Sequence, residues 1–348
     1  MPTLEQRLGV EVPVIQAPMA GVQGSALAIA VSDAGGLGSL PCAMLTPESL
    51  RNELEAIRQH TSKPYNVNFF CHVQPEPDPL AESVWRDTLA PYYQEYGIDP
   101  DAIPEGASRA PFSHQMADVL EAFKPPVVSF HFGLPEPDLL QRVKDWGAIV
   151  MSSATTVAEA LWLEANGADV IIAQGLEAGG HRGMFLTTDV TTQSGTFTLL
   201  SQIVAAVNLP VVAAGGIADA NGVSAAMALG ASGVQVGTAY LCSDEATTSQ
   251  IHRTALQSEA AKHTALTNLF SGRPARGIVN RVISELGPIS DKPPAFPFAS
   301  TGIGPLRSAA EKQNSGDFTP LWAGQNVSGC RSVSAAEITQ ELAAGLRS

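Results

Sequence analysis

One segment of the chain, AQGLEAGGHRGMF at residues 173–185, combines residue types that suit a catalytic site. Gln174 carries an amide that can donate and accept hydrogen bonds along the edge of a heteroaromatic ring. Gly179 and Gly180 lack side chains, so the backbone can pass close to a flat ligand. His181 follows them directly, and we therefore expect it to face such a ligand.

His181 is the first candidate for a catalytic base. A neutral imidazole titrates near neutrality, so it can take a proton and hold it during turnover. The competing interpretation is a histidine that only forms hydrogen bonds within its loop. The surrounding GGHRG pattern, just after an expected strand, favours the catalytic role. Glu177 and Arg182 are expected to be ion-pair partners that order the same loop.

Two later segments predict a phosphate site. VVAAGGIAD places Gly215 and Gly216 at the end of an apolar run, with Asp219 as an expected helix N-cap. Backbone N–H groups in such turns can bind phosphate, and glycine admits the group close to the chain. Glycines also end strands in many α/β proteins, and the phosphate could belong to a cofactor or to a substrate. The second segment, GVQVGTAYL, contributes Gln235, Val236, Gly237 and Thr238.

Further candidates lie at the ends of other apolar runs. His131 in VVSFHFG is expected to point inward and to support the site or contact the substrate. Asn68 in NVNFF could reach a ligand in the barrel mouth, and His72 just after it has a weaker claim. Met19 and Gly21 in IQAPMAG could present a thioether and backbone amides to a ring system, although Met19 could equally pack in the core.

The elements that must position these residues alternate between short β-branched runs and Ala- and Leu-rich segments of helical period. This alternation is typical of an α/β fold with parallel strands, and eight strands close a (β/α)₈ TIM barrel, whose catalytic residues lie at the C-terminal ends of the strands. The expected strands are residues 12–19, 37–42, 65–71, 127–133, 148–154, 169–175, 211–216 and 233–241.

Two segments are too long to be barrel connections. Residues 72–126 are expected to be an insertion that caps one face, and residues 246–348 a mainly helical lobe over the active site. Within that lobe we expect a loop at 287–306 and a final helix at 335–346. The interpretation is a barrel domain over 1–245, carrying the insertion, followed by the lobe.

Composition restricts the class of partner. The 348 residues include 34 acidic and 20 basic side chains, so the net charge of −14 repels nucleic-acid backbones and acidic lipids. Neither nucleic acid nor a membrane is expected as a partner. No basic segment followed by a long apolar run begins the chain, which favours a cytoplasmic location. The four cysteines fit neither a disulfide framework nor metal-ligand spacing, so no metal site is expected.

Taken together, these segments resemble the class I nitronate monooxygenases over nearly the full length of the chain. The motifs that carry the resemblance are QAPMAGVQGSALAIAVSDAGGLG, NVNFFCH, VSFHFGLP, AQGLEAGGHRGMF, VVAAGGIAD, VQVGTAYL and FSGRPARGIVN. Each glycine pair alone is weak, but their joint match in order is specific.

The resemblance implies an enzyme with noncovalent FMN that oxidises alkyl nitronates, such as propionate 3-nitronate, with O₂ to carbonyl compounds and nitrite. It places His181 at the family's catalytic histidine. It does not place the walls of the substrate pocket, for which Phe296, Phe298, Tyr240 and the tyrosines near residue 92 are candidates. The implied flavin contacts are Met19, Gly21, Asn68, Gln174, Gly179, Gly216 and Gln235 through Thr238.

Other functions fit the same residues. An FMN barrel of the same superfamily could take hydride from a nicotinamide cofactor, as a quinone or enoyl reductase does. A flavin-free phosphate-binding barrel, such as a lyase or an isomerase, could also use the glycine turns, and so could a binding protein that retains the fold without turnover.

Overall fold

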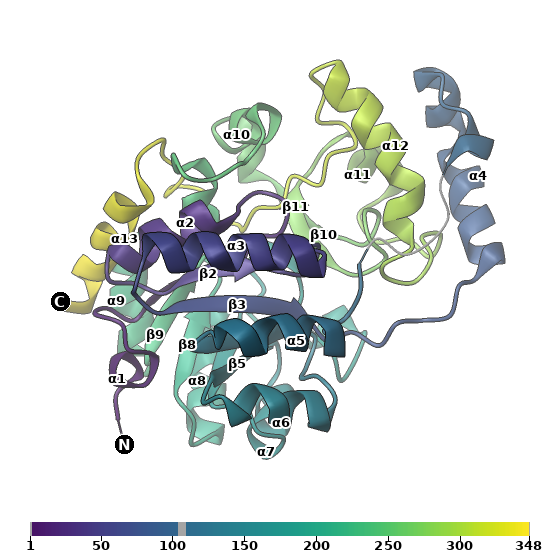
Figure 1. Cartoon of the computed structure of the whole chain (residues 1–348). Helices are drawn as coiled ribbons and strands as arrows, with labels where there is room; N and C mark the ends of the chain where they lie inside the picture. The colour runs from purple at the N-terminus through teal and green to yellow at the C-terminus, as the bar shows by residue number, and fades with distance from the viewer. Residues whose placement is uncertain (1, 104–108, 348) are drawn as a thin grey trace.

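The eight expected strands are all present and form one parallel sheet in a computed structural model that describes residues 2–103 and 109–347. The order around the sheet is β1-β9-β8-β6-β5-β4-β3-β2, and a bridge between Ile15 and Leu37 joins the two edge strands. The prediction of a TIM barrel is therefore confirmed (Figure 1). The strands are β1 Val14–Gln16, β2 Gly38–Pro41, β3 Tyr65–Phe70, β4 Val127–His131, β5 Ile149–Ala154, β6 Val170–Gln174, β8 Val211–Ala214 and β9 Gly233–Val236.

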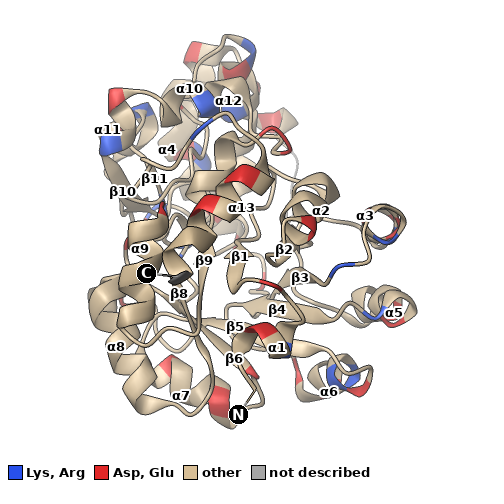
Figure 2. Ribbon diagram, turned by 90° about the vertical axis from the view of Figure 1, so that its left-hand side faces the viewer, with Lys and Arg blue, Asp and Glu red and all other residues tan. Residues whose placement is uncertain are grey.

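The barrel strands carry no Lys, Arg, Asp or Glu, which is why they pack as a buried parallel sheet. Charged side chains lie instead on the surrounding helices and loops (Figure 2). A short helix, α1 Leu4–Leu8, closes the N-terminal end of the barrel. Its Leu4 and Leu8 pack in one cluster with Ile15, Met151 and Val212. Polar residues such as His131 and Gln174 lie at the opposite, C-terminal end of the strands.

A ring of helices covers the outside of the barrel. Thr46 and Thr156 cap α3 and α7, and Asp219 caps α9 by accepting from Gly222 N at 2.9 Å, as expected. The helices of the ring are α2 Ser25–Asp33, α3 Pro47–His60, α5 His114–Phe123, α6 Pro137–Asp145, α7 Val157–Ala165, α8 Thr196–Ala206, α9 Ala220–Ala228 and α13 Ala335–Ala344.

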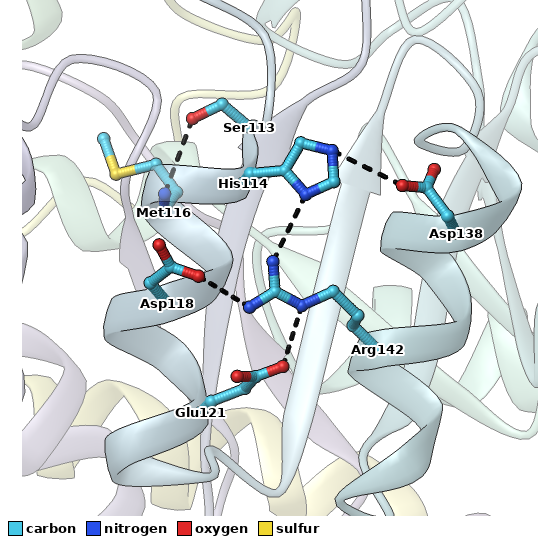
Figure 3. A network of polar contacts seen from close by, with 7 residues as sticks. All are labelled: Ser113, His114, Met116, Asp118, Glu121, Asp138 and Arg142. Carbon is cyan, nitrogen blue, oxygen red and sulfur yellow. Dashed lines mark hydrogen bonds and ion pairs between the residues drawn. The ribbon is translucent and has the colours of Figure 1, made fainter.

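A polar network joins α5 to α6 on the outer surface (Figure 3). Arg142 donates to Asp118 at 2.7 Å and to Glu121 at 2.8 Å, and its Nη1 lies 3.3 Å from Nδ1 of His114. The other ring nitrogen of His114 lies 3.4 Å from Asp138. These groups are largely exposed, so the network contributes at most about 1 kcal/mol to stability.

A lobe stands beside the C-terminal ends of the strands, with α4 and α12 packed side by side (Figure 1). Trp85 and Tyr93 of α4 donate to the carbonyl oxygens of Ala299 and Gly302, at 3.0 and 2.7 Å. The lobe contains α4 Pro79–Tyr96, α10 Gln250–Leu256, β10 Thr264–Thr267, β11 Ala275–Ile278, α11 Arg281–Leu286 and α12 Ala299–Lys312. Short 3₁₀ turns lie at Pro100–Ala102, Val190–Thr192, Thr238–Cys242, Glu259–Lys262 and Gly345–Arg347.

Several expected boundaries were wrong. The last barrel strand ends at Val236, because residues 238–242 turn into a 3₁₀ helix. The expected loop at 287–306 contains the start of α12, whose packing against α4 outweighs the helix-breaking tendency of Gly302, Gly304 and Pro305.

The lobe and insertion boundaries also differ from the sequence-based division. The final helix, α13, packs against α2 and α9 of the barrel and not over the mouth. Residues 72–126 contain both a lobe helix, α4, and a barrel helix, α5. The division into a barrel and a lobe stays an interpretation. Across the described ranges, no helix is both long and apolar enough to cross a membrane.

Candidate active site

A cavity opens at the C-terminal ends of the barrel strands, where a TIM barrel places its active site. Segments from the barrel strands and from the lobe line it together. The sequence-predicted residues that line it are Met19, Asn68, His131, Gln174, Gly179, Gly180, His181, Gly215, Gly216, Gln235, Val236, Gly237 and Thr238. Gly21 lies between the lining residues Ala20 and Val22 but does not line the cavity itself.

The loop that carries His181 is held by the lobe. Gly180–His181 forms a short strand, β7, that pairs antiparallel with β11, so that His181 lies opposite Ala275. Arg276 of β11 donates from Nε to the carbonyl of Leu176 at 2.9 Å. The backbone of the histidine is therefore fixed by a segment almost a hundred residues further along the chain.

Two side chains at the ends of barrel strands, His131 and Gln174, hold the backbone of His181 by hydrogen bonds. The carbonyl oxygen of His181 accepts from Nε2 of His131 at 3.1 Å and from Nε2 of Gln174 at 3.0 Å. Gln174 also accepts from Gly183 N at 2.7 Å, so its amide clamps both ends of the turn. The sequence placed Gln174 at this strand end, but its contacts to the loop were not expected.

The hydrogen bonds of His131 fix the tautomer of its ring. A carbonyl oxygen can only accept, so Nε2 must carry the proton, and Nδ1 can then accept from Ser153 Oγ at 3.1 Å. Burial lowers the pKa of His131 to about 4. The ring is neutral at neutral pH and is suited to orient His181 rather than to exchange protons.

Among the residues that the structure describes, the imidazole of His181 has one side-chain hydrogen-bond partner. Its Nε2 lies 2.8 Å from Oγ of Ser271, a buried residue of the lobe. Burial is the main cause that lowers the pKa of His181 well below its ordinary value, and the positive charges of Arg109 and Arg273 act in the same direction. The neutral form, which is the form that can accept a proton, is thus favoured at neutral pH.

The expected ion pair between Glu177 and Arg182 was wrong. Arg182 is fully buried and donates to the carbonyls of Gly175 and Gln174 at 2.7 and 2.6 Å and to Gln193 at 2.9 Å. Glu177 instead accepts from the backbone N and the hydroxyl of Thr196, at 2.7 and 2.8 Å. Both residues order the loop, but each does so through its own partners.

Replacing Arg182 by Met is expected to lower the free energy of unfolding by about 2–4 kcal/mol, because two buried carbonyl oxygens lose a charged donor. Chemical denaturation monitored by circular dichroism measures this change. Arg142→Met, which removes the half-buried surface arginine of Figure 3, is the matched control and should cost at most about 1 kcal/mol. Equal losses in the two variants would contradict the role assigned to Arg182.

The glycine turns after β8 and β9 form the other end of the cavity. Gly215 and Gly216 have φ angles of 116° and 75°, which favour glycine. Oε1 of Gln235 is buried without a hydrogen-bond partner among the described groups. A buried amide oxygen without a partner is costly, so it marks a place where a ligand donor is expected.

Sequence reasoning missed the residues that the lobe brings to His181. The ring of Trp322 lies 5.6 Å from the imidazole, and His252 holds Trp322 through a bond of 3.0 Å from Nε2 to its carbonyl oxygen. Phe70 at the end of β3 has its ring 6.2 Å from the same imidazole. The FSGRPARGIVN motif contains Ser271 and was the one signal that could have indicated this contact.

Of Phe296, Phe298 and Tyr240, the aromatic candidates for the pocket walls, only Phe296 lies beside His181. Phe296 lies beside the site, with its ring 5.5 Å from that of His181. Tyr240 is buried away from it and bonds Thr339 at 2.9 Å, and Phe298 lines a different hollow beside Trp85. His72 is buried next to Phe296, with the ring centroids 4.8 Å apart.

By fold and by the placement of its polar side chains, the chain is a TIM-barrel enzyme. His181 is partly buried, is favoured in its neutral form and is held at the mouth of the barrel, which suits proton transfer to or from a bound substrate. Within the described part of the chain, no group of three His, Cys, Asp or Glu residues could hold a metal ion.

Comparison with known proteins identifies the family. The family model described as nitronate monooxygenase matches residues 2–345, and the chain belongs to that family of FMN-dependent oxidoreductases. It is 41% identical to a nitronate monooxygenase of Paraburkholderia phytofirmans over 96% of this chain and 92% of the relative. It is also 41% identical to one of Pseudomonas aeruginosa, over 98% and 97% of the two chains.

Solved structures are similar to this chain over nearly its full length. A nitroalkane oxidase from Streptomyces ansochromogenes superposes with a TM-score of 0.88 at 38% identity, covering 97% of this chain and 96% of its own. FabK from Thermotoga maritima superposes with a TM-score of 0.71 at 26% identity, over 100% and 96%.

Proposed function

We propose that this enzyme holds FMN without a covalent bond in the barrel cavity and oxidises alkyl nitronates, such as propionate 3-nitronate, with O₂ to carbonyl compounds and nitrite. The observation that carries the proposal is one cavity that joins glycine turns after β8 and β9 to a neutral His181 held by the lobe. Membership of the nitronate monooxygenase family supports the same reaction.

The residues of the cavity fit FMN. Gly215 and Gly216 leave backbone amides accessible to a phosphate, and Thr238 adds a hydroxyl. The unpartnered Oε1 of Gln235 can accept from the ring N–H of a flavin. Met19 and Gly180 offer a soft thioether and a side-chain-free backbone to a flat ring. We assign these residues, with Asn68, Gln174, Gly179, Val236 and Gly237, to flavin binding.

When bound, FMN would supply the electron-transfer chemistry, since a nitronate is a delocalised anion that can give up an electron. The side chains of the chain bind, orient and protect the reactants. When Nε2 of His181 accepts from Ser271, Nδ1–H can donate to the nitro oxygens of a nitronate; when Nε2 donates instead, Nδ1 can take the carbon-bound proton of a neutral nitroalkane. The hydroxyl of Ser271 can donate to the carbonyl of Arg273 at 3.4 Å and accept from Nε2 of His181, which leaves the lone pair at Nδ1.

The surroundings of His181 keep water away from the reacting atoms. Rings of Phe70, Phe132, Phe296 and Trp322 lie 5.5–6.2 Å from the imidazole. Such a dry site strengthens hydrogen bonds to an anion. His131 and Gln174 hold the backbone of His181, so the imidazole does not need to be ordered during the reaction.

Oxygen uptake tests the proposed function. Purified enzyme with FMN is mixed with propionate 3-nitronate in one reaction and with NADPH in another, and O₂ and nitrite are followed. We expect rapid O₂ uptake with release of nitrite from the nitronate, and slow oxidation of NADPH. Rapid anaerobic reduction of the flavin by NADPH, with no turnover of nitronate, would assign the chain to the reductases instead.

A further inference from the structure

The segment that leads into α13 covers one end of the cavity. Residues 323–330, here called the strap, contribute Gly324 and Asn326 to the cavity lining. Gly324 N donates to Thr238 Oγ1 at 2.9 Å, and Nδ2 of Asn326 donates to the carbonyl oxygen of Gly216 at 3.0 Å. Both acceptors belong to residues that we assign to the phosphate of FMN. The strap therefore lies over the end of the cavity that suits a phosphate.

The strap ends at Cys330, which lies against a second cysteine. Sγ of Cys330 donates to the carbonyl oxygen of Thr238 at 3.1 Å, and Thr238 begins a 3₁₀ turn that ends at Cys242. The thiol of Cys330 also forms a hydrogen bond with the thiol of Cys242. Both side chains pack in the same apolar cluster. The two sulfur atoms are thus neighbours, although the residues are far apart in the sequence.

Backbone contacts hold the two chain segments side by side just beyond the cysteines. Asp244 N donates to the carbonyl oxygen of Val333 at 3.1 Å, and the carboxylate of Glu245 accepts from Ala335 N at 2.8 Å. Two thiols can be linked without strain only where the Cα atoms that carry them lie within about 7 Å. The contact between the thiols and these flanking bonds place the pair where a link needs little movement of the chain.

The pair loses its first proton more easily than a single buried thiol does. The hydrogen bond with Cys330 is the main cause that lowers the pKa of Cys242, and the positive charge of Arg253 acts in the same direction. The same contact raises the pKa of Cys330. For Cys42 and Cys71, burial raises the pKa of each thiol. Since the thiolate is the reactive form, the pair is expected to react before the other two cysteines.

We infer that Cys242 and Cys330 form a redox modification site, where a peroxide converts the two thiols to a disulfide that fastens the strap over the phosphate end of the cavity. Cys330 is half-exposed and meets the peroxide, whereas Cys242 is buried behind it. All four cysteines are free thiols in the structure, so the link forms only on oxidation. The effect on FMN rests on the proposed function, but the disulfide itself does not.

The oxidation consumes one hydrogen peroxide for each disulfide. The sulfur of Cys330, after its proton has passed to Cys242, attacks one oxygen of the peroxide, and the O–O bond breaks. The other oxygen leaves as hydroxide and becomes water, and Cys330 becomes a sulfenic acid. The sulfur of Cys242 then attacks that of Cys330, so that the S–S bond forms and the S–O bond breaks. The second hydroxide takes the remaining thiol proton and leaves as water.

The test treats the purified protein with hydrogen peroxide and maps its cysteines by mass spectrometry of peptides. We expect a reducible link between Cys242 and Cys330, with Cys42 and Cys71 still present as thiols. Cys330→Ser should form no link, and neither should Cys242→Ala, which leaves no hydroxyl in the buried position. Cys71→Ser is the matched control, because Cys71 is half-exposed like Cys330, and it should form the link normally. Oxidation that leaves Cys242 and Cys330 unlinked would overturn the site.

The rate at which FMN leaves the protein tests the effect on the cavity. Release on dilution is followed by flavin fluorescence, and it should be about fivefold or more slower from the linked protein, because a cross-link restricts local opening of the strap. Reduction with a dithiol should restore the rate, and peroxide should not change it in Cys330→Ser. Equal rates from linked and reduced protein would overturn the fastening of the strap. If the protein bound no FMN while the link still formed, the proposed function would fail, together with the effect on FMN, and the modification site would stand.

Discussion

The variant His181→Asn is expected to keep its flavin and to lose about 10²- to 10⁴-fold in kcat/KM for neutral nitroalkanes. Asparagine retains hydrogen-bonding groups but cannot take the carbon-bound proton at neutral pH. Preformed nitronates have already lost that proton, so their turnover should fall much less. Oxygen uptake with nitroethane and with ethyl nitronate, at equal flavin content, measures the two losses.

The control for this variant is His60→Asn, because His60 is exposed on α3 and bonds only the carbonyl of Ala56 in the described structure. It should leave both activities unchanged. If His181→Asn lowered both activities by the same factor, His181 would not be the base, and its contribution would be limited to binding the nitro oxygens.

A second large effect is expected at the glycine turn after β8. Gly215→Ala places a side chain on a residue with φ of 116°, and the new Cβ would lie 2.9 Å from Thr196 Oγ1 and 3.0 Å from Ala178 N. Backbone strain and overpacking together should lower the free energy of unfolding by about 2–5 kcal/mol. Displacement of the turn should also weaken FMN binding, and thermal unfolding and flavin content measure both effects.

Gly304→Ala is the matched control for Gly215→Ala. Gly304 lies within α12, and a Cβ there would meet no atom within 4 Å. Alanine favours a helix over glycine, so this variant should be more stable by up to about 1 kcal/mol with unchanged flavin content. A Gly215→Ala protein with normal stability and full flavin would contradict the role of the turn.

The barrel could be predicted from the sequence because its strands are separate apolar runs. Residues 127–130 and 170–174 are each a continuous buried stretch bounded by turn residues, and all such runs became strands. The helix α12 could not be predicted in the same way. Its sequence contains Gly302, Gly304 and Pro305, and its packing on Trp85 and Tyr93 depends on a segment that lies two hundred residues earlier.

The sequence predicts only those residues of the site that lie on the barrel strands or in the turns directly after them. His131, Gln174 and Gln235 are located by the strands on which they lie, and the glycine turns by their dipeptides. The contact between His181 and Ser271 arises from the pairing of β7 with β11, which depends on tertiary structure. Local pattern carries no information about such a pairing, and the same holds for Arg109 beside Phe296.

The proposed function requires that the mouth of the barrel binds FMN, so the visible absorption spectrum of the purified protein is its most direct test. We expect flavin bands at one FMN per chain, lost on removal of the flavin and restored by added FMN. A colourless protein that binds no added FMN would contradict the proposed function, because neither the glycine turns nor His181 would then have the proposed partner.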